Sequence, residues 1–117
     1  MKARSIYHKR RVDANQKAIV QALKAMGASV TDLHSVGRGC PDLLVGYRGG
    51  IILLEVKSSE KARFTKAEEE WSRTWRGEHC YAVWDTLGAC LIVQSIALPS
   101  FKPGTVWSAA VPVRETK

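Results

Sequence analysis

The sequence predicts one α/β domain whose elements follow the order helix, three strands, helix, strand. Two segments carry apolar residues at helical spacing, and two apolar runs are joined by a glycine-containing turn, as in a β-hairpin. At 117 residues, with 45% hydrophobic and 25% charged residues, the chain can bury one modest core. A second domain is therefore not expected.

The first predicted helix runs from Asp13 to Met26, because its apolar residues recur every three or four positions and Gly27 follows as a stop signal. Asp13 and Gln16 also fit the spacing of a capping box, which would give both residues a structural role. Residues 1–12 precede this helix as a basic arm with five Lys or Arg side chains. Such an arm is either flexible and bound to phosphates or simply solvated.

Three strands are predicted after this helix. Residues 28–36 form the first, and a loop at 37–40 leads into a hairpin whose apolar runs are residues 43–47 and 51–57. Both runs are nearly all apolar, which is typical of strands that are covered on both faces.

The second predicted helix begins at Thr65, where Thr65 and Glu68 have the spacing of a capping box, and it continues through Trp75. Trp71 and Trp75 lie one turn apart on the same face, so they are interpreted as core residues rather than as platforms for base stacking.

A further strand is expected at residues 80–84. Residues 86–96 fit either a capped helix or a turn followed by another strand, and both interpretations remain open. The predicted organisation is thus a basic arm at 1–12, a domain at 13–97 and a C-terminal extension at 98–117.

Asp42, Glu55 and Lys57 are the candidate catalytic residues. Alternation along a strand places Glu55 and Lys57 on one face. If Arg48 and Gly49 form a two-residue turn, Asp42 faces Glu55 at about 5 Å, where two carboxylates repel unless a cation lies between them. This favours a hard divalent ion, Mg²⁺ or Mn²⁺. A turn one residue longer would separate the carboxylates, and the plain alternative is a turn cap at Asp42 with an ordinary ion pair at the strand end.

The charge balance favours nucleic acid as the partner. The chain has 18 Lys and Arg against 11 Asp and Glu, a net charge of +7. Arg10 and Arg11 in the basic arm, Arg38 between two glycines and Ser58 after the hairpin are the candidate contacts to phosphates.

Several classes of protein are disfavoured. The three cysteines are odd in number and lack a C-x-x-C arrangement, so neither a disulfide framework nor a zinc site is indicated. No apolar stretch approaches the length that spans a membrane, and no secretion signal is recognised, so a cytoplasmic location is expected.

The motifs together resemble the PD-(D/E)xK nuclease superfamily, and most closely the VRR-NUC family in its small stand-alone, phage-type form. The resemblance covers residues 13–96 and rests on Gln16, the run 39–44, the triplet 55–57 and the helix entry at 64–65 ahead of Trp71. It implies a restriction-endonuclease-like core, with a mixed central sheet of about four strands flanked by helices.

The resemblance also implies roles for individual residues. Asp42 and Glu55 would bind the metal together with the backbone carbonyl of Val56, while Lys57 would serve catalysis and Gln16 would orient water or substrate. Asp13 stands where relatives more often carry Glu. Many relatives have Gln in the second helix where this chain has acidic residues at 68–70, so no role is carried onto them.

The function expected from these observations is a Mg²⁺- or Mn²⁺-dependent endonuclease that hydrolyses phosphodiester bonds in DNA. By family analogy it would select flap or four-way (Holliday) junction DNA and act as a homodimer in a bacterial or phage-infected host cell. Two alternatives remain: a DNA-binding module with little nuclease activity, and a nuclease that processes RNA.

Overall fold

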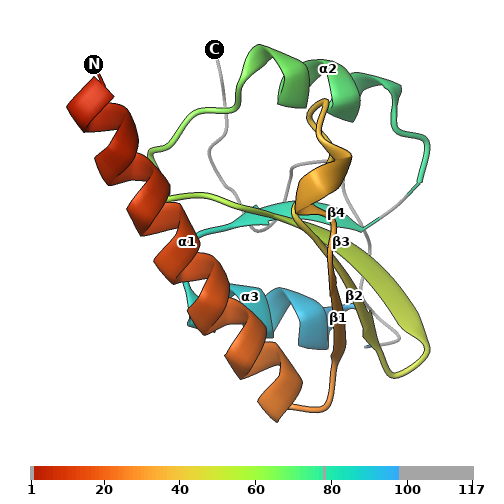
Figure 1. The fold of residues 1–117 in the computed structure, drawn as a ribbon. Helices are drawn as coiled ribbons and strands as arrows, with labels where there is room; N and C mark the ends of the chain where they lie inside the picture. Colours follow the sequence, from red (N-terminus) through yellow and green to blue (C-terminus); the bar gives the residue numbers. More distant parts are fainter. Residues whose placement is uncertain (1, 78, 98–117) are drawn as a thin grey trace.

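The computed structural model describes residues 2–77 and 79–97, and its element order confirms the predicted α/β class (Figure 1). The elements in chain order are α1 (Lys2–Ala25), β1 (Ser29–Asp32), the 3₁₀ turn η1 (His34–Val36), β2 (Leu43–Tyr47), β3 (Gly50–Val56), α2 (Lys66–Thr74), β4 (Cys80–Val83) and α3 (Thr86–Ser95). No helix among these described residues is long and apolar enough to cross a membrane.

The four strands form one mixed sheet in the order β1-β2-β3-β4, antiparallel except for the parallel pair β3 and β4. Tyr47 pairs with Gly50, so the hairpin turn has the two residues Arg48 and Gly49. Both have positive φ, at 50° and 85°, as the twist of a two-residue hairpin requires. Leu43 therefore pairs with Leu54, and the same count places Asp42 opposite Glu55.

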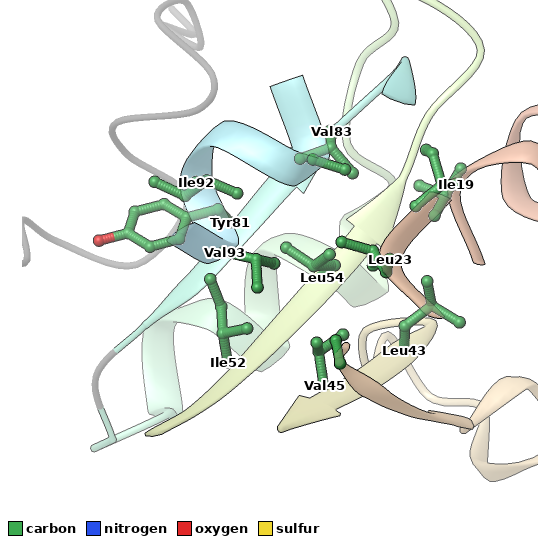
Figure 2. Close-up of a cluster of buried hydrophobic side chains, with 13 residues drawn as sticks. Ile19, Leu23, Leu43, Val45, Ile52, Leu54, Tyr81, Val83, Ile92 and Val93 are labelled. Atoms are coloured by element: carbon green, nitrogen blue, oxygen red, sulfur yellow. The ribbon is translucent and has the colours of Figure 1, made fainter. Parts of the chain in front are cut away.

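Helices cover both faces of this sheet. α1 and α3 pack on one face, where their side chains meet those of all the central strands (Figure 2). The labelled core residues on that side are Ile19, Leu23, Leu43, Val45, Ile52, Leu54, Tyr81, Val83, Ile92 and Val93. α2 lies on the opposite face (Figure 1), where Trp71 packs with Phe64 against a smaller cluster of Leu53, Cys80 and Ala82. Odd-numbered residues of β3 therefore point toward α2, and even-numbered residues point toward α1 and α3.

The core assignment of the tryptophans is confirmed for Trp71. Its ring stacks on Trp75 with centroids 4.7 Å apart and planes 17° apart, while Trp75 remains 36% exposed. The open assignment after Asp85 is also settled. Residues 86–95 form α3, because the Asp85 side chain accepts a hydrogen bond from the Gly88 amide and caps the helix.

Two predicted boundaries are wrong. α1 begins at Lys2, not at Asp13, so the expected flexible arm has helical backbone over residues 2–12 and no capping box exists at Asp13. These residues contain no Gly or Pro and are rich in good helix formers, so nothing in them stops the helix. The first strand ends at Asp32, whose carboxylate accepts a hydrogen bond from the His34 amide and turns the chain into η1. The predicted extension at 98–117 lies outside the described residues.

Candidate active site

The structure brings Asp42, Glu55 and Lys57 together on the face of the sheet that α2 covers. Glu55 lies in β3 and Lys57 directly follows it on the same face, and both are buried, with exposures of 5% and 9%. The Lys57 Nζ lies 3.7 Å from Glu55 Oε2. Asp42 directly precedes β2, and its Oδ2 accepts a hydrogen bond of 2.7 Å from the Val56 amide. Three charged groups at the ends of two adjacent strands thus lie close together, with Glu55 and Lys57 buried and Asp42 partly buried.

Glu68, from the first turn of α2, is a fourth charged member that sequence reasoning missed. Its Oε1 lies 2.6 Å from Lys57 Nζ, closer than Glu55 Oε2 at 3.7 Å. The ammonium also donates to the backbone carbonyl of Arg63 at 3.2 Å and lies 5.1 Å from the centroid of the Phe64 ring. The capping box at Thr65 was the available signal, because a capping-box acid turns its carboxylate back toward the segment that precedes its helix.

The electrostatics follow from three carboxyl groups around one ammonium. Burial, a hydrogen bond with Glu68 and the nearby negative charge of Asp42 raise the pKa of Glu55 to about 10, although Lys57 opposes the shift. Burial also raises the pKa of Asp42, against the opposing effect of the Val56 amide. Burial acts to raise the pKa of Glu68 as well, but hydrogen bonds from Glu55 and Lys57 outweigh it and lower that pKa. One proton on Glu55 thus relieves the excess negative charge.

The residues present fit a hard divalent cation. Glu55 Oε1 is buried and has no hydrogen-bond partner, which is costly unless another group completes its coordination. The donors at hand are carboxylate and carbonyl oxygens, which suit Mg²⁺ and Mn²⁺. A cation would also replace the proton that the crowded carboxyl groups retain. Within residues 2–77 and 79–97, no group of three or more His, Cys, Asp or Glu side chains is arranged to hold a metal ion.

Gln16 contacts Asp32, whose negative charge acts on Asp42, and its role toward water or substrate stays a prediction. Its Nε2 lies 3.5 Å from Asp32 Oδ2, in a pocket of about 300 Å³ between α1 and β1. The neighbouring Asn15 reaches the site backbone instead, because its Nδ2 donates to the carbonyl oxygens of Lys57 at 2.9 Å and Ser58 at 3.3 Å. Asn15 was missed, although Asn is unfavourable within a helix and its presence there calls for a reason.

The candidate nucleic-acid contacts surround this region unevenly. Arg11 Nη2 donates to the Ser58 carbonyl at 3.4 Å, which ties the basic part of α1 to the chain that leaves β3. Arg10 and Arg38 are exposed. Arg38 has a φ of 57° in the loop before Asp42.

The loop that carries Arg38 packs directly on α2. A Cβ added at Gly39 would overlap the backbone carbonyl of Ala67 and lie 2.8 Å from the Glu68 nitrogen, so only glycine permits this approach. The loop ahead of Asp42 and the helix that carries Glu68 are therefore held in contact.

Comparison with known proteins identifies the fold and the family. No protein-family model matches the sequence, and no curated protein matches it. A solved structure described as a VRR_NUC domain is similar, with a TM-score of 0.57 and 30% sequence identity over 72% of this chain and 95% of that one. The fold is accordingly a restriction-endonuclease-like α/β fold, and the chain belongs to the VRR-NUC family of nuclease domains.

Proposed function

We propose that this protein is a metal-dependent endonuclease that hydrolyses phosphodiester bonds in DNA at Asp42, Glu55 and Lys57. The observation that carries the proposal is the cluster of these three side chains, with Glu55 and Lys57 buried, on one face of the sheet in a VRR-NUC domain. Buried charged groups destabilise a domain, because their desolvation is only partly offset by pairing. Their presence here therefore supports a functional role.

In this proposal Asp42, Glu55 and the Val56 carbonyl hold a Mg²⁺ or Mn²⁺ ion. When bound, that ion polarises a phosphoryl oxygen and lowers the pKa of a coordinated water. Lys57 orients the attacking water and offsets the negative charge that develops on the phosphoryl group in the transition state. Asn15 contributes indirectly, since it fixes the backbone at Lys57 from α1. Gln16, beside Asp32, orients water or substrate in this proposal.

The substrate is proposed to be DNA with branches, either a flap or a four-way junction. The net charge of +7 and the exposed Arg10, Arg11 and Arg38 support binding to a polyanion. A domain of this size has little room to enclose a duplex alone, and enzymes with this fold that resolve junctions act as symmetric dimers. The proposal therefore includes a homodimer that presents two sites to opposing strands.

The test compares cleavage of matched linear duplex, single-stranded, flap and four-way-junction DNA in Mg²⁺, Mn²⁺ or EDTA. Wild type is compared with Lys57→Ala and with Lys24→Ala, which removes the same charge from an exposed position near the far end of α1. Metal-dependent cutting that is lost only in Lys57→Ala, with DNA binding in EDTA unchanged, supports the proposal. The same panel made in RNA shows whether DNA is the preferred polymer.

The contrary result is equally clear. If no substrate is cut under any metal condition, while wild type and Lys57→Ala bind DNA alike, the chain is a DNA-binding module on a nuclease fold. If RNA is cut and DNA is not, the domain is a nuclease but the proposed substrate is wrong.

A further inference from the structure

We propose that Glu68 is the positioning residue for Lys57, so that the capping box of α2 aims the catalytic ammonium. This inference rests on the proposed nuclease function and adds a residue to its machinery. It assigns a role to Glu68, whose contact with Lys57 could not be predicted from the sequence.

The contacts of the ammonium single out Glu68. Lys57 Nζ lies 2.6 Å from Glu68 Oε1 and 3.2 Å from the Arg63 carbonyl oxygen, and both are hydrogen bonds. Glu55 Oε2, at 3.7 Å, lies beyond hydrogen-bond distance. An ammonium has three donors, so two are fixed by the α2 side of the site and one is left for a reacting group. Glu55 therefore receives no hydrogen bond from Lys57.

Glu68 is itself held rigidly. Its Oε1 accepts a hydrogen bond of 2.9 Å from the Thr65 amide, and its own amide donates to Thr65 Oγ1 at 3.1 Å. Backbone contact with Gly39 and packing of Trp71 on the sheet fix the helix that carries it. A lysine side chain is long and flexible, so a rigid acceptor keeps the Lys57 ammonium in one position and reduces the conformational entropy lost in each reaction.

Capping alone does not explain a glutamate here. Gln completes a capping box as well as Glu does, because the cap needs only an acceptor oxygen. The negative charge of Glu68 lies near Asp42 and Glu55, where a third carboxylate is unfavourable by itself. The Lys57 ammonium, 2.6 Å from the Glu68 carboxylate, is the positively charged group that gains from that charge.

The experiment compares Glu68→Ala, Glu68→Gln and Thr65→Ala in the full chain. Glu68→Ala should lower kcat by about 10- to 100-fold with little change in KM or in DNA affinity measured in EDTA. Glu68→Gln retains both the cap and an acceptor for Lys57 but loses the negative charge, so it should recover only part of kcat. Thr65→Ala removes the hydroxyl of the cap but leaves the Glu68–Lys57 contact and the hydrogen bond from the Thr65 amide to Glu68, so it should lower Tm and reduce kcat much less than Glu68→Ala does.

A second readout does not depend on cleavage. In ¹⁵N-detected spectra of metal-free protein, a Lys57 ammonium held by two acceptors exchanges slowly and gives a signal, which Glu68→Ala should abolish. If Glu68→Ala keeps full kcat and the signal, or if Thr65→Ala loses kcat as severely as Glu68→Ala, the residue only caps α2 and the inference is overturned. If wild type does not cut DNA, the proposed function fails, and the ammonium signal alone decides the positioning role.

Discussion

Replacing Glu55 by glutamine should stabilise the metal-free protein at neutral pH while it abolishes cleavage. Glu55 is 5% exposed, and one of its oxygens is buried without a hydrogen-bond partner. The folded protein keeps a proton on this carboxyl group to avoid a buried negative charge beside Asp42 and Glu68. Glutamine has the same shape and carries no charge, so it removes the conflict but also the proposed metal ligand.

The sign and size follow from the two protonation states. The pKa of Glu55 is about 10 in the folded protein, against an ordinary value of 4.5. Below the ordinary value both states carry the proton and pH has no effect. As pH rises above it, the unfolded chain releases the proton and the folded protein does not, so stability falls by about 1.4 kcal/mol per pH unit. At about pH 7 the loss is about 3 kcal/mol, a large share of the stability of a domain of this size.

The assay is urea denaturation in EDTA at a series of pH values from about 5 to 8. The difference between Glu55→Gln and wild type reports on Glu55, because Asp42, with its raised pKa, and Glu68, with its lowered pKa, are present in both proteins. Glu60→Gln, at an exposed position in the loop after β3, is the matched control and should track wild type. Parallel stability curves for wild type and Glu55→Gln across this range would refute the reasoning.

Three further outcomes are expected. Gly39→Ala should lower both Tm and kcat, because the new Cβ collides with the backbone of α2. Gly49→Ala is the control: its φ is equally positive but its Cβ enters open space, so it should cost only about 1–2 kcal/mol in thermal unfolding and leave cleavage intact. Asn15→Ala should reduce kcat by about tenfold in steady-state assays, because the Lys57 carbonyl loses its donor from α1. Mg²⁺ at about 100 times its Kd should stabilise wild type by about 2.7 kcal/mol in calorimetry and should not stabilise Asp42→Asn. Equal Mg²⁺ shifts in both proteins would remove Asp42 from the metal site.

The hairpin and its three site residues could be predicted because the rules that fix them are local. A two-residue turn sets the register of its strands, and a period of two sets which side chains share a face. Asp42, Glu55 and Lys57 therefore follow from counting outward along two strands, without knowledge of the rest of the fold. The start of α1 could not be read in the same way, because residues 2–12 lack apolar periodicity and only the absence of a breaker carries the helix through them.

Glu68 and Asn15 illustrate what local rules leave out. Glu68 had a sufficient local explanation as half of a capping box, so nothing in the sequence demanded a second partner. Asn15 contacts a carbonyl 42 positions away, and that contact exists only once α1 packs across the sheet. Both side chains act on Lys57 from elements other than β3. The catalytic motif could thus be predicted, while the groups that hold it in place depend on tertiary packing.

The position of the cluster explains how the domain tolerates its charge. β3 pairs with a neighbour on each side and is covered on both faces, and its residues 52–54 and 56 are all buried hydrophobics. A domain optimised for stability alone would continue that pattern at Glu55, because apolar replacement of buried charges is commonly neutral or stabilising. The unfavourable group instead interrupts the best-supported strand, where backbone pairing and the surrounding core can offset the roughly 3 kcal/mol that it costs near neutral pH. A divalent cation would then bind to a rigid and already strained set of oxygens, so part of its binding energy would appear as stability of the folded domain.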